Sequence, residues 1–136
     1  MKSFPMRMQA SFAGDDNAVQ DVQVERFDGT AWSPLALSEK SPGFRIFTYS
    51  AFACLLVHLR MVGAECGVKL QDTTATFELV AAEDWVVEAV TAHFDARTRD
   101  GIVPDGAAAT IVARMERCPV ARNLDRARLA LSVTLT

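Results

Sequence analysis

The longest apolar segment of the chain, residues 41–67, constrains the fold more than any other feature. It reads SPGFRIFTYSAFACLLVHLRMVGAECG and has the composition of one long helix. Ser41 is a favourable N-cap with Pro42 in the first helical position. Gly67 is a suitable terminator, because glycine adopts the left-handed conformation without steric cost. We therefore predict one helix over this segment.

The predicted helix is apolar on nearly every side, so we expect it to be buried on every side. Polar residues and Arg60 interrupt the apolar run, which we take to be too short to span a bilayer. The chain has 136 residues, of which 50% are hydrophobic, and we treat residues 1–136 as a single domain. So short a chain covers such a helix poorly, which suggests that a dimer completes the burial.

Alternation of apolar and polar residues predicts β-strands before this helix. Residues 6–13 and 19–27 both alternate and are joined by turn residues, which predicts a hairpin. In its second strand we expect Val22 and Val24 to face the core. Residues 31–37 could form a short third strand, and the proline within it would confine that strand to a sheet edge.

The same alternation predicts strands over residues 69–80, 85–98 and 128–136 after the helix. Between the last two of these strands, residues 104–118 form an alanine-rich second helix that Pro119 ends. The order of elements indicates an α+β fold with an antiparallel sheet. Both helices should then pack on one face of that sheet.

Charge and composition exclude several classes of partner. The net charge is −3 and no run of lysine and arginine occurs, so we expect no nucleic acid partner. The N-terminal residues contain no apolar run of signal-peptide length, and we expect a cytoplasmic protein that is not bound to a membrane. Three cysteines without a C-x-x-C pair and only two histidines give poor support to a disulfide scaffold or a zinc site.

The three cysteines fall in different contexts. Cys54 is near the middle of the long helix, Cys118 is the last residue of the predicted second helix, and Cys66 is at the C-terminal end of the long helix. A buried cysteine is most often a small hydrophobe, and Cys66 fits this interpretation because a helix C-terminus opposes a thiolate. Cys54 and Cys118, on helices that share one face of the sheet, could instead form a redox pair.

Two segments around these cysteines resemble one known family. Residues 116–124, ERCPVARNL, resemble the C-P-V motif of the OsmC/Ohr family, named for osmotically inducible and organic hydroperoxide resistance proteins. Ser41-Pro42, followed by SAFAC at residues 50–54, resembles that family's approach to a long helix that carries its first cysteine. The Gly67-Val68 helix end and the order of elements match as well.

The resemblance implies an OsmC-like fold and an intertwined homodimer with the two long helices at its centre. It also implies a thiol peroxidase for organic hydroperoxides that needs no metal or bound cofactor. Cys54 would be the peroxidatic thiolate and Cys118 the resolving cysteine, and an external dithiol would reduce their disulfide. Apolar residues near Cys54 in the sequence would suit an alkyl or fatty-acyl hydroperoxide, namely Phe47, Phe52, Leu55 and Leu56.

The activating group is the point on which alternatives remain open. The family's active members stabilise the thiolate with an arginine held by a glutamate, whereas the helix start here carries Gly43, Phe44 and Arg45. Arg45 could replace that arginine, or be a solvated residue of the first turn. His58 follows Cys54 by one helical turn and could touch it, or be a histidine bonded to the backbone.

Two other functions remain alternatives to the peroxidase. One is an OsmC-like dimer without peroxidase activity that binds a small apolar ligand or senses redox state. The other is an interaction module in which all three cysteines fill the core.

Overall fold

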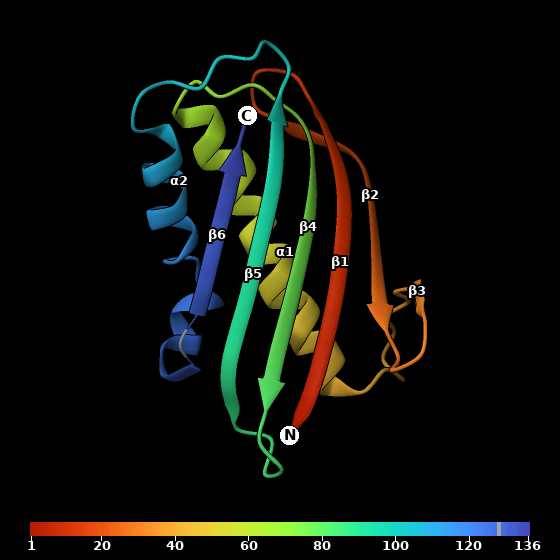
Figure 1. Cartoon of the computed structure of the whole chain (residues 1–136). Helices are drawn as coiled ribbons and strands as arrows, with labels where there is room; N and C mark the ends of the chain where they lie inside the picture. Colours follow the sequence, from red (N-terminus) through yellow and green to blue (C-terminus); the bar gives the residue numbers. More distant parts are fainter. Residues whose placement is uncertain (128) are drawn as a thin grey trace.

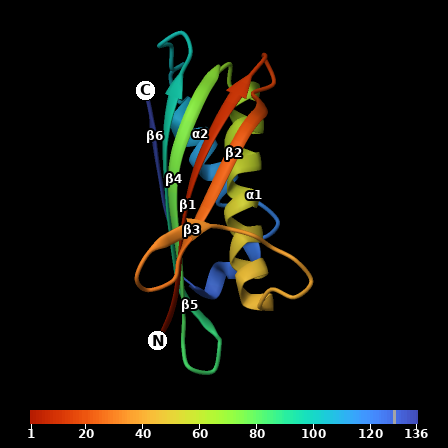
Figure 2. The same cartoon turned by 90° about the vertical axis from the view of Figure 1, so that its right-hand side faces the viewer.

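The computed structural model describes residues 1–127 and 129–136, and it contains one six-stranded sheet with two helices on one face (Figures 1 and 2). The strands follow the order β3-β2-β1-β4-β5-β6 across the sheet. They are β1 (Lys2–Ala13), β2 (Ala18–Phe27), β3 (Trp32–Pro34), β4 (Leu70–Ala81), β5 (Val87–Thr98) and β6 (Leu129–Leu135). The two α-helices are α1 (Gly43–Glu65) and α2 (Ala107–Met115), and a short 3-10 helix, η1 (Ala121–Ala127), follows α2.

The sheet is mixed, which corrects the expectation of a purely antiparallel one. Four strand pairs are antiparallel, but β6 pairs with β5 in parallel, from Val90 opposite Leu129 to Ala96 opposite Leu135. The chain leaves β5, passes through α2 and η1 on the helical face, and returns to the starting end of β5. Such a crossover produces a parallel neighbour, whereas a tight turn produces an antiparallel one. The predicted first residue of this strand, Arg128, lies outside the described residues.

The bounds of α1 differ from the prediction at its start and agree with it at its end. The helix begins at Gly43, and Pro42 is its N-cap with an extended ψ of 131°. Ser41 does not cap it: the helix has no side-chain cap, and the Ser41 hydroxyl instead accepts a hydrogen bond from the backbone N–H of Ser38 at 3.0 Å. At the other end Gly67 has a φ of +77°, the left-handed conformation expected of it.

The core lies between α1 and the central strands. Phe52 of α1 is fully buried and stacks on Phe77 of β4 with 5.2 Å between ring centroids. It also meets the edge of Phe94 on β5 at 5.8 Å. Seen nearly edge-on, α1 lies along one face of the sheet (Figure 2). Burying such large rings stabilises the fold, by about 2–3 kcal/mol for each phenylalanine side chain.

The opposite side of α1 is exposed in the single chain, so the chain alone does not bury the helix all round. Phe47, Val57 and Met61 are 37–42% exposed in the single chain. These residues recur with alternating intervals of three and four, together with Ser50 and Cys54, as in a helix that packs against another helix. We call Phe47, Ser50, Cys54, Val57 and Met61 the outer stripe of α1.

The length of α1 also departs from the expectation drawn from its sequence. The helix has 23 residues, and an 18-residue segment of it has a mean hydropathy of 1.5, so by length and composition it could cross a membrane. The expectation that the segment is too short to do so was wrong. The inner side of α1 nevertheless packs on the sheet through residues that are at most 7% exposed, including Phe52, Leu55 and Leu59.

Two strands of the first half of the chain differ from their predicted form. The third strand is only Trp32–Pro34, although it does lie at the sheet edge. Val22 is 42% exposed rather than in the core, and only Val24 is partly buried. Strand β2 lies beyond β1, so α1 covers its inner face incompletely.

Candidate active site

Cys54 and Cys118 reach the same place from two different elements. Cys54 is half-buried in the middle of α1, whereas Cys118 is fully buried in the turn that follows α2. The prediction that Cys118 ends the second helix was wrong, because α2 closes at Met115. A residue before proline disfavours the helical conformation, so Pro119 ends the helix earlier than its own position.

The packing of α2 and its following turn against α1 creates a cluster of three reactive side chains. The sulfurs of Cys54 and Cys118 and a ring nitrogen of His58 all lie within 4.8 Å of one another. All three cysteines of the chain are free thiols. The structure thus brings together the two cysteines that the sequence paired, and it adds one of the two candidate activating residues.

His58 lies over the Cys54 thiol, one helical turn further along α1. Its Nδ1 is 3.9 Å from Sγ of Cys54 and 2.9 Å from the carbonyl oxygen of the same residue. A neutral ring with its hydrogen on Nδ1 donates to the carbonyl, which is the backbone-bonded histidine considered above. A protonated ring can share that N–H between the carbonyl oxygen and a thiolate. Both sequence interpretations of His58 therefore hold at once.

Cys118 has the character of a thiol that stays protonated. Burial, followed by the neighbouring Cys54 sulfur, raises the pKa of Cys118 to about 11. The backbone N–H of Ala121 donates to its sulfur at 3.2 Å and opposes this rise only in part. At neutral pH Cys118 is consequently a poor attacking nucleophile, which suits the resolving position rather than the peroxidatic one.

Arg45 and Cys66 do not join this cluster. Arg45 lies roughly two and a half turns before Cys54, which places it about 13 Å away along the helix axis and on the opposite side of α1. There it lines a hollow of about 430 Å³ together with Phe4, Arg26 and other residues. Cys66 is the C-cap residue of α1, more than three turns beyond Cys54.

Of the four apolar residues expected around a substrate, three are buried in the core and one is partly exposed on the Cys54 side of α1. Phe52, Leu55 and Leu56 are at most 7% exposed, so they belong to the core and cannot contact a bound molecule. Phe47, at 37% exposed, lies two turns before Cys54 on the same side of the helix. Of the four, only Phe47 can form part of an apolar approach to the thiol.

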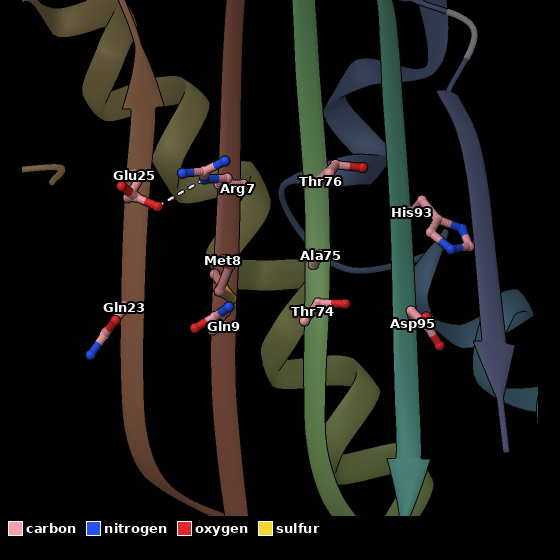
Figure 3. A pocket seen from close by; sticks show the side chains of 10 residues that line it. All are labelled: Arg7, Met8, Gln9, Gln23, Glu25, Thr74, Ala75, Thr76, His93 and Asp95. Atoms are coloured by element: carbon pink, nitrogen blue, oxygen red, sulfur yellow. Dashed lines mark hydrogen bonds and ion pairs between the residues drawn. The ribbon is translucent and has the colours of Figure 1, made fainter. Parts of the chain in front are cut away.

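A polar hollow occupies the other face of the sheet (Figure 3). It has a volume of about 440 Å³, and an ion pair of 2.8 Å between Arg7 and Glu25 crosses part of it. His93 is on this outer face, where it forms a hydrogen bond of 2.6 Å with Ser132. The sheet separates this hollow from the cysteines, so neither it nor His93 belongs to the thiol cluster.

Comparison with known proteins identifies the fold. No protein-family model matches the sequence, and no curated protein does. Three similar solved structures are an OsmC-like hydroperoxide resistance protein from Jannaschia sp. CCS1, an OsmC-like protein from Mycoplasma pneumoniae and an organic hydroperoxide resistance protein from Elizabethkingia anophelis. Their TM-scores are 0.59, 0.57 and 0.54, and their sequence identities are 11%, 10% and 17%. The match covers 90%, 94% and 95% of this chain and 86%, 95% and 96% of theirs. The chain therefore has the fold of the OsmC-like and organic hydroperoxide resistance proteins, as the resemblance of its two cysteine segments predicted.

Proposed function

We propose that this protein is a cysteine-based peroxidase that reduces organic hydroperoxides, with Cys54 as the peroxidatic and Cys118 as the resolving residue. The observation that carries the proposal is the cluster itself. Two thiols that are far apart in the sequence, and one imidazole, lie within 4.8 Å of one another. The fold supports it too, because two of the similar solved structures are named for hydroperoxide resistance.

The reaction needs only these side chains and a dithiol. The Cys54 thiolate attacks the outer oxygen of ROOH, the O–O bond breaks, and the alkoxide takes a proton, which gives Cys54 sulfenic acid and ROH. The Cys118 thiol then attacks the sulfenic sulfur, so that a disulfide forms and water leaves. An external dithiol reduces the disulfide by two exchange steps and becomes oxidised itself. A reducing, cytoplasmic compartment would supply such a dithiol.

His58 is the activating group in this proposal. As an imidazolium it stabilises the Cys54 thiolate across the 3.9 Å between Nδ1 and Sγ, and it can then protonate the leaving alkoxide. Arg45 of the same chain is on the far side of α1 and cannot take this role. An arginine of a partner subunit could still add to it.

The proposed active form is a homodimer that buries the outer stripe of α1. Exposed apolar residues at alternating intervals of three and four are suited to helix packing against a second copy of α1. Cys54 lies within that stripe, so the dimer interface would enclose the thiol in an apolar environment. An alkyl hydroperoxide would then approach along residues such as Phe47.

The alternative is a dimer of the same fold that senses redox state or binds an apolar ligand without turnover. The observation in its favour is the position of Arg45, which leaves Cys54 without a cation from this residue. Fast alkylation of Cys54 well below pH 8 would favour the peroxidase, and a thiol that resists alkylation at neutral pH would favour the alternative.

The direct test is consumption of cumene hydroperoxide with a dithiol reductant and a chelator present. We expect the wild-type protein to turn over and Cys54→Ser to lose activity to the background level. Cys66→Ser is the matched control, because Cys66 is a free thiol outside the cluster and its removal should leave turnover unchanged. A wild-type rate no higher than that of Cys54→Ser would disprove the proposal.

A further inference from the structure

We propose that Cys54, His58 and Cys118 also form a binding site for a zinc ion, with an open fourth position. From the sequence a zinc site was poorly supported, because no C-x-x-C pair occurs and the chain has only two histidines. The fold removes that objection, since it places two sulfurs and one ring nitrogen within 4.8 Å of one another. This inference concerns metal binding by the reduced protein and does not require peroxidase activity.

The spacing of the three ligand atoms is close to what zinc needs. With Zn–S distances of about 2.3 Å and Zn–N distances of about 2.0–2.1 Å, tetrahedral ligand atoms lie roughly 3.5–3.8 Å apart. Sγ of Cys54 and Nδ1 of His58 are 3.9 Å apart, and no pair in the cluster exceeds 4.8 Å. Zinc on Nδ1 would take the place of its hydrogen, so the hydrogen bond to the Cys54 carbonyl oxygen would be lost and the ring hydrogen would move to Nε2. Contractions of at most about 1.3 Å, reached by side-chain rotation, would complete the site. A disulfide, at about 2.05 Å between sulfurs, needs a larger approach.

The donor set determines which metal fits. Two thiolates and one imidazole are ligands for zinc and other soft or borderline ions, whereas magnesium and calcium require oxygen ligands. Three protein ligands with one free position are typical of open zinc sites, in which water takes the fourth place.

The ligands also lie on elements that hold them in place. Cys54 and His58 are one turn apart on α1, the helical spacing at which two side chains can share one metal. Cys118 is fixed by the turn after α2, where the N–H of Ala121 donates to its sulfur at 3.2 Å. Hydrogen bonds of this kind orient metal ligands and tune their affinity. In the single chain Cys54 and His58 are only half-buried.

Metal binding and peroxide reduction would exclude each other at this cluster. Zinc needs both sulfurs as thiolates, and the peroxidase cycle consumes both in a disulfide. If the proposed function holds, a zinc-loaded protein reacts as Zn(S⁻)₂ plus ROOH plus two protons, which gives the disulfide, ROH, water and free Zn²⁺. The hydroperoxide is the two-electron oxidant in this step, and the two sulfurs are oxidised. Zinc would therefore protect the pair from adventitious oxidation and leave once a hydroperoxide has reacted.

The test is titration of the reduced, metal-free protein with zinc in competition with a chromophoric chelator and without peroxide. We expect one zinc per chain in the wild-type protein. We expect a loss of affinity greater than about 100-fold in Cys54→Ser, Cys118→Ser and His58→Ala, because removing even a hydrogen-bonding partner of a ligand costs about 10–100-fold. The matched controls are Cys66→Ser and His93→Ala, which remove the remaining cysteine and histidine and should bind zinc as the wild-type protein does.

A measurement on the wild-type protein alone guards against variants that fail to fold. Cobalt in place of zinc should give thiolate-to-cobalt charge-transfer bands and the visible bands of a tetrahedral ion, and zinc should protect Cys54 and Cys118, but not Cys66, from alkylation. Binding by folded His58→Ala within threefold of the wild-type protein, or protection of Cys66, would overturn the three-ligand site. Because this assay contains no peroxide and the peroxidase assay contains a chelator, either proposal can fail while the other stands.

Discussion

Nδ1 of His58 lies 3.9 Å from the sulfur of Cys54 and 2.9 Å from the carbonyl oxygen of that same residue. A hydrogen on Nδ1 donates to the carbonyl oxygen and has the sulfur within reach as a second, weaker acceptor. A neutral ring satisfies the carbonyl and leaves the thiol unassisted. If Cys54 reacts as a thiolate, as proposed above, a protonated His58 is in position to stabilise it.

Replacing His58 by alanine should slow the reaction of Cys54 with electrophiles. We expect the alkylation rate of Cys54 by iodoacetamide at pH 7 to fall by about 100-fold, the lower end of what a positioned acid–base group contributes. The measurement is the time course of modification at Cys54, followed by peptide mass spectrometry. His93→Ala, on the opposite face of the sheet, is the control and should react like the wild-type protein. An unchanged rate in His58→Ala would remove His58 from the activating role.

Much of the fold could be predicted from the sequence, because the signals that carry it lie in short segments of the chain. Alternation with a period of two located the strands, and a left-handed glycine ended α1 where expected. The two cysteine segments pointed to the correct fold before any geometry was known. Each of these signals depends only on residues that are close together in the sequence, so a single sequence is enough to detect it.

The predictions were wrong or incomplete where contacts between distant parts of the chain determine the structure. The parallel pairing of β6 follows from the route of the crossover through α2, which no local pattern encodes. The exposed outer stripe of α1 has the same apolar composition as its buried side, so hydropathy could not separate them. Helical spacing could place His58, but not Arg45, on the Cys54 side of α1, whereas only the fold shows that Cys118 meets them there.

Oxidation should link Cys54 to Cys118. We expect one equivalent of cumene hydroperoxide to produce a single intramolecular disulfide, because the two sulfurs are within 4.8 Å and Cys118 lies in a turn outside the regular helix. Digestion under non-reducing conditions followed by mass spectrometry would identify the linked peptides. Cys66→Ser should form the same link. Accumulation of Cys54 sulfinic acid with Cys118 still reduced would contradict the resolving role.

The stability of the reduced protein should fall at alkaline pH because of Cys118. Burial and the Cys54 sulfur raise the pKa of Cys118 from about 9 to about 11, so the folded protein retains a proton that the unfolded chain releases. The contribution of the neutral thiol is therefore complete below about pH 9 and is lost as the pH rises to about 11. Urea unfolding over this range should show a steeper decline for the wild-type protein than for Cys118→Ser. Parallel declines in the two proteins would contradict the assignment.

A charge in the outer stripe of α1 should dissociate the proposed dimer. Met61 is 42% exposed in the single chain, and Met61→Glu would bury one carboxylate per subunit in the interface, at a cost of about 3 kcal/mol or more for each. In sedimentation experiments we expect the wild-type protein to have the mass of a dimer and Met61→Glu to have the mass of a monomer. Ile102→Glu is the control, because Ile102 is 60% exposed in the loop between β5 and α2 and is not part of the outer stripe. A monomeric wild-type protein would refute the interface.

Asn17 should contribute more to stability than any other residue of the β1–β2 turn. It is fully buried, has a φ of +51°, and joins three elements through its side chain. Its amide nitrogen donates to the carbonyl oxygens of Arg60 at 3.2 Å and Val68 at 3.0 Å, and its oxygen accepts from the N–H of Leu70 at 2.9 Å. Since Asn17→Ala leaves these groups buried without partners and keeps a left-handed backbone, we expect a loss of about 3–5 kcal/mol in the free energy of unfolding. Asp15→Ala, a change at an exposed position of the same turn, should cost less than about 0.5 kcal/mol. Urea denaturation of both variants decides the point, and a loss below about 1 kcal/mol for Asn17→Ala would show that water replaces the three bonds.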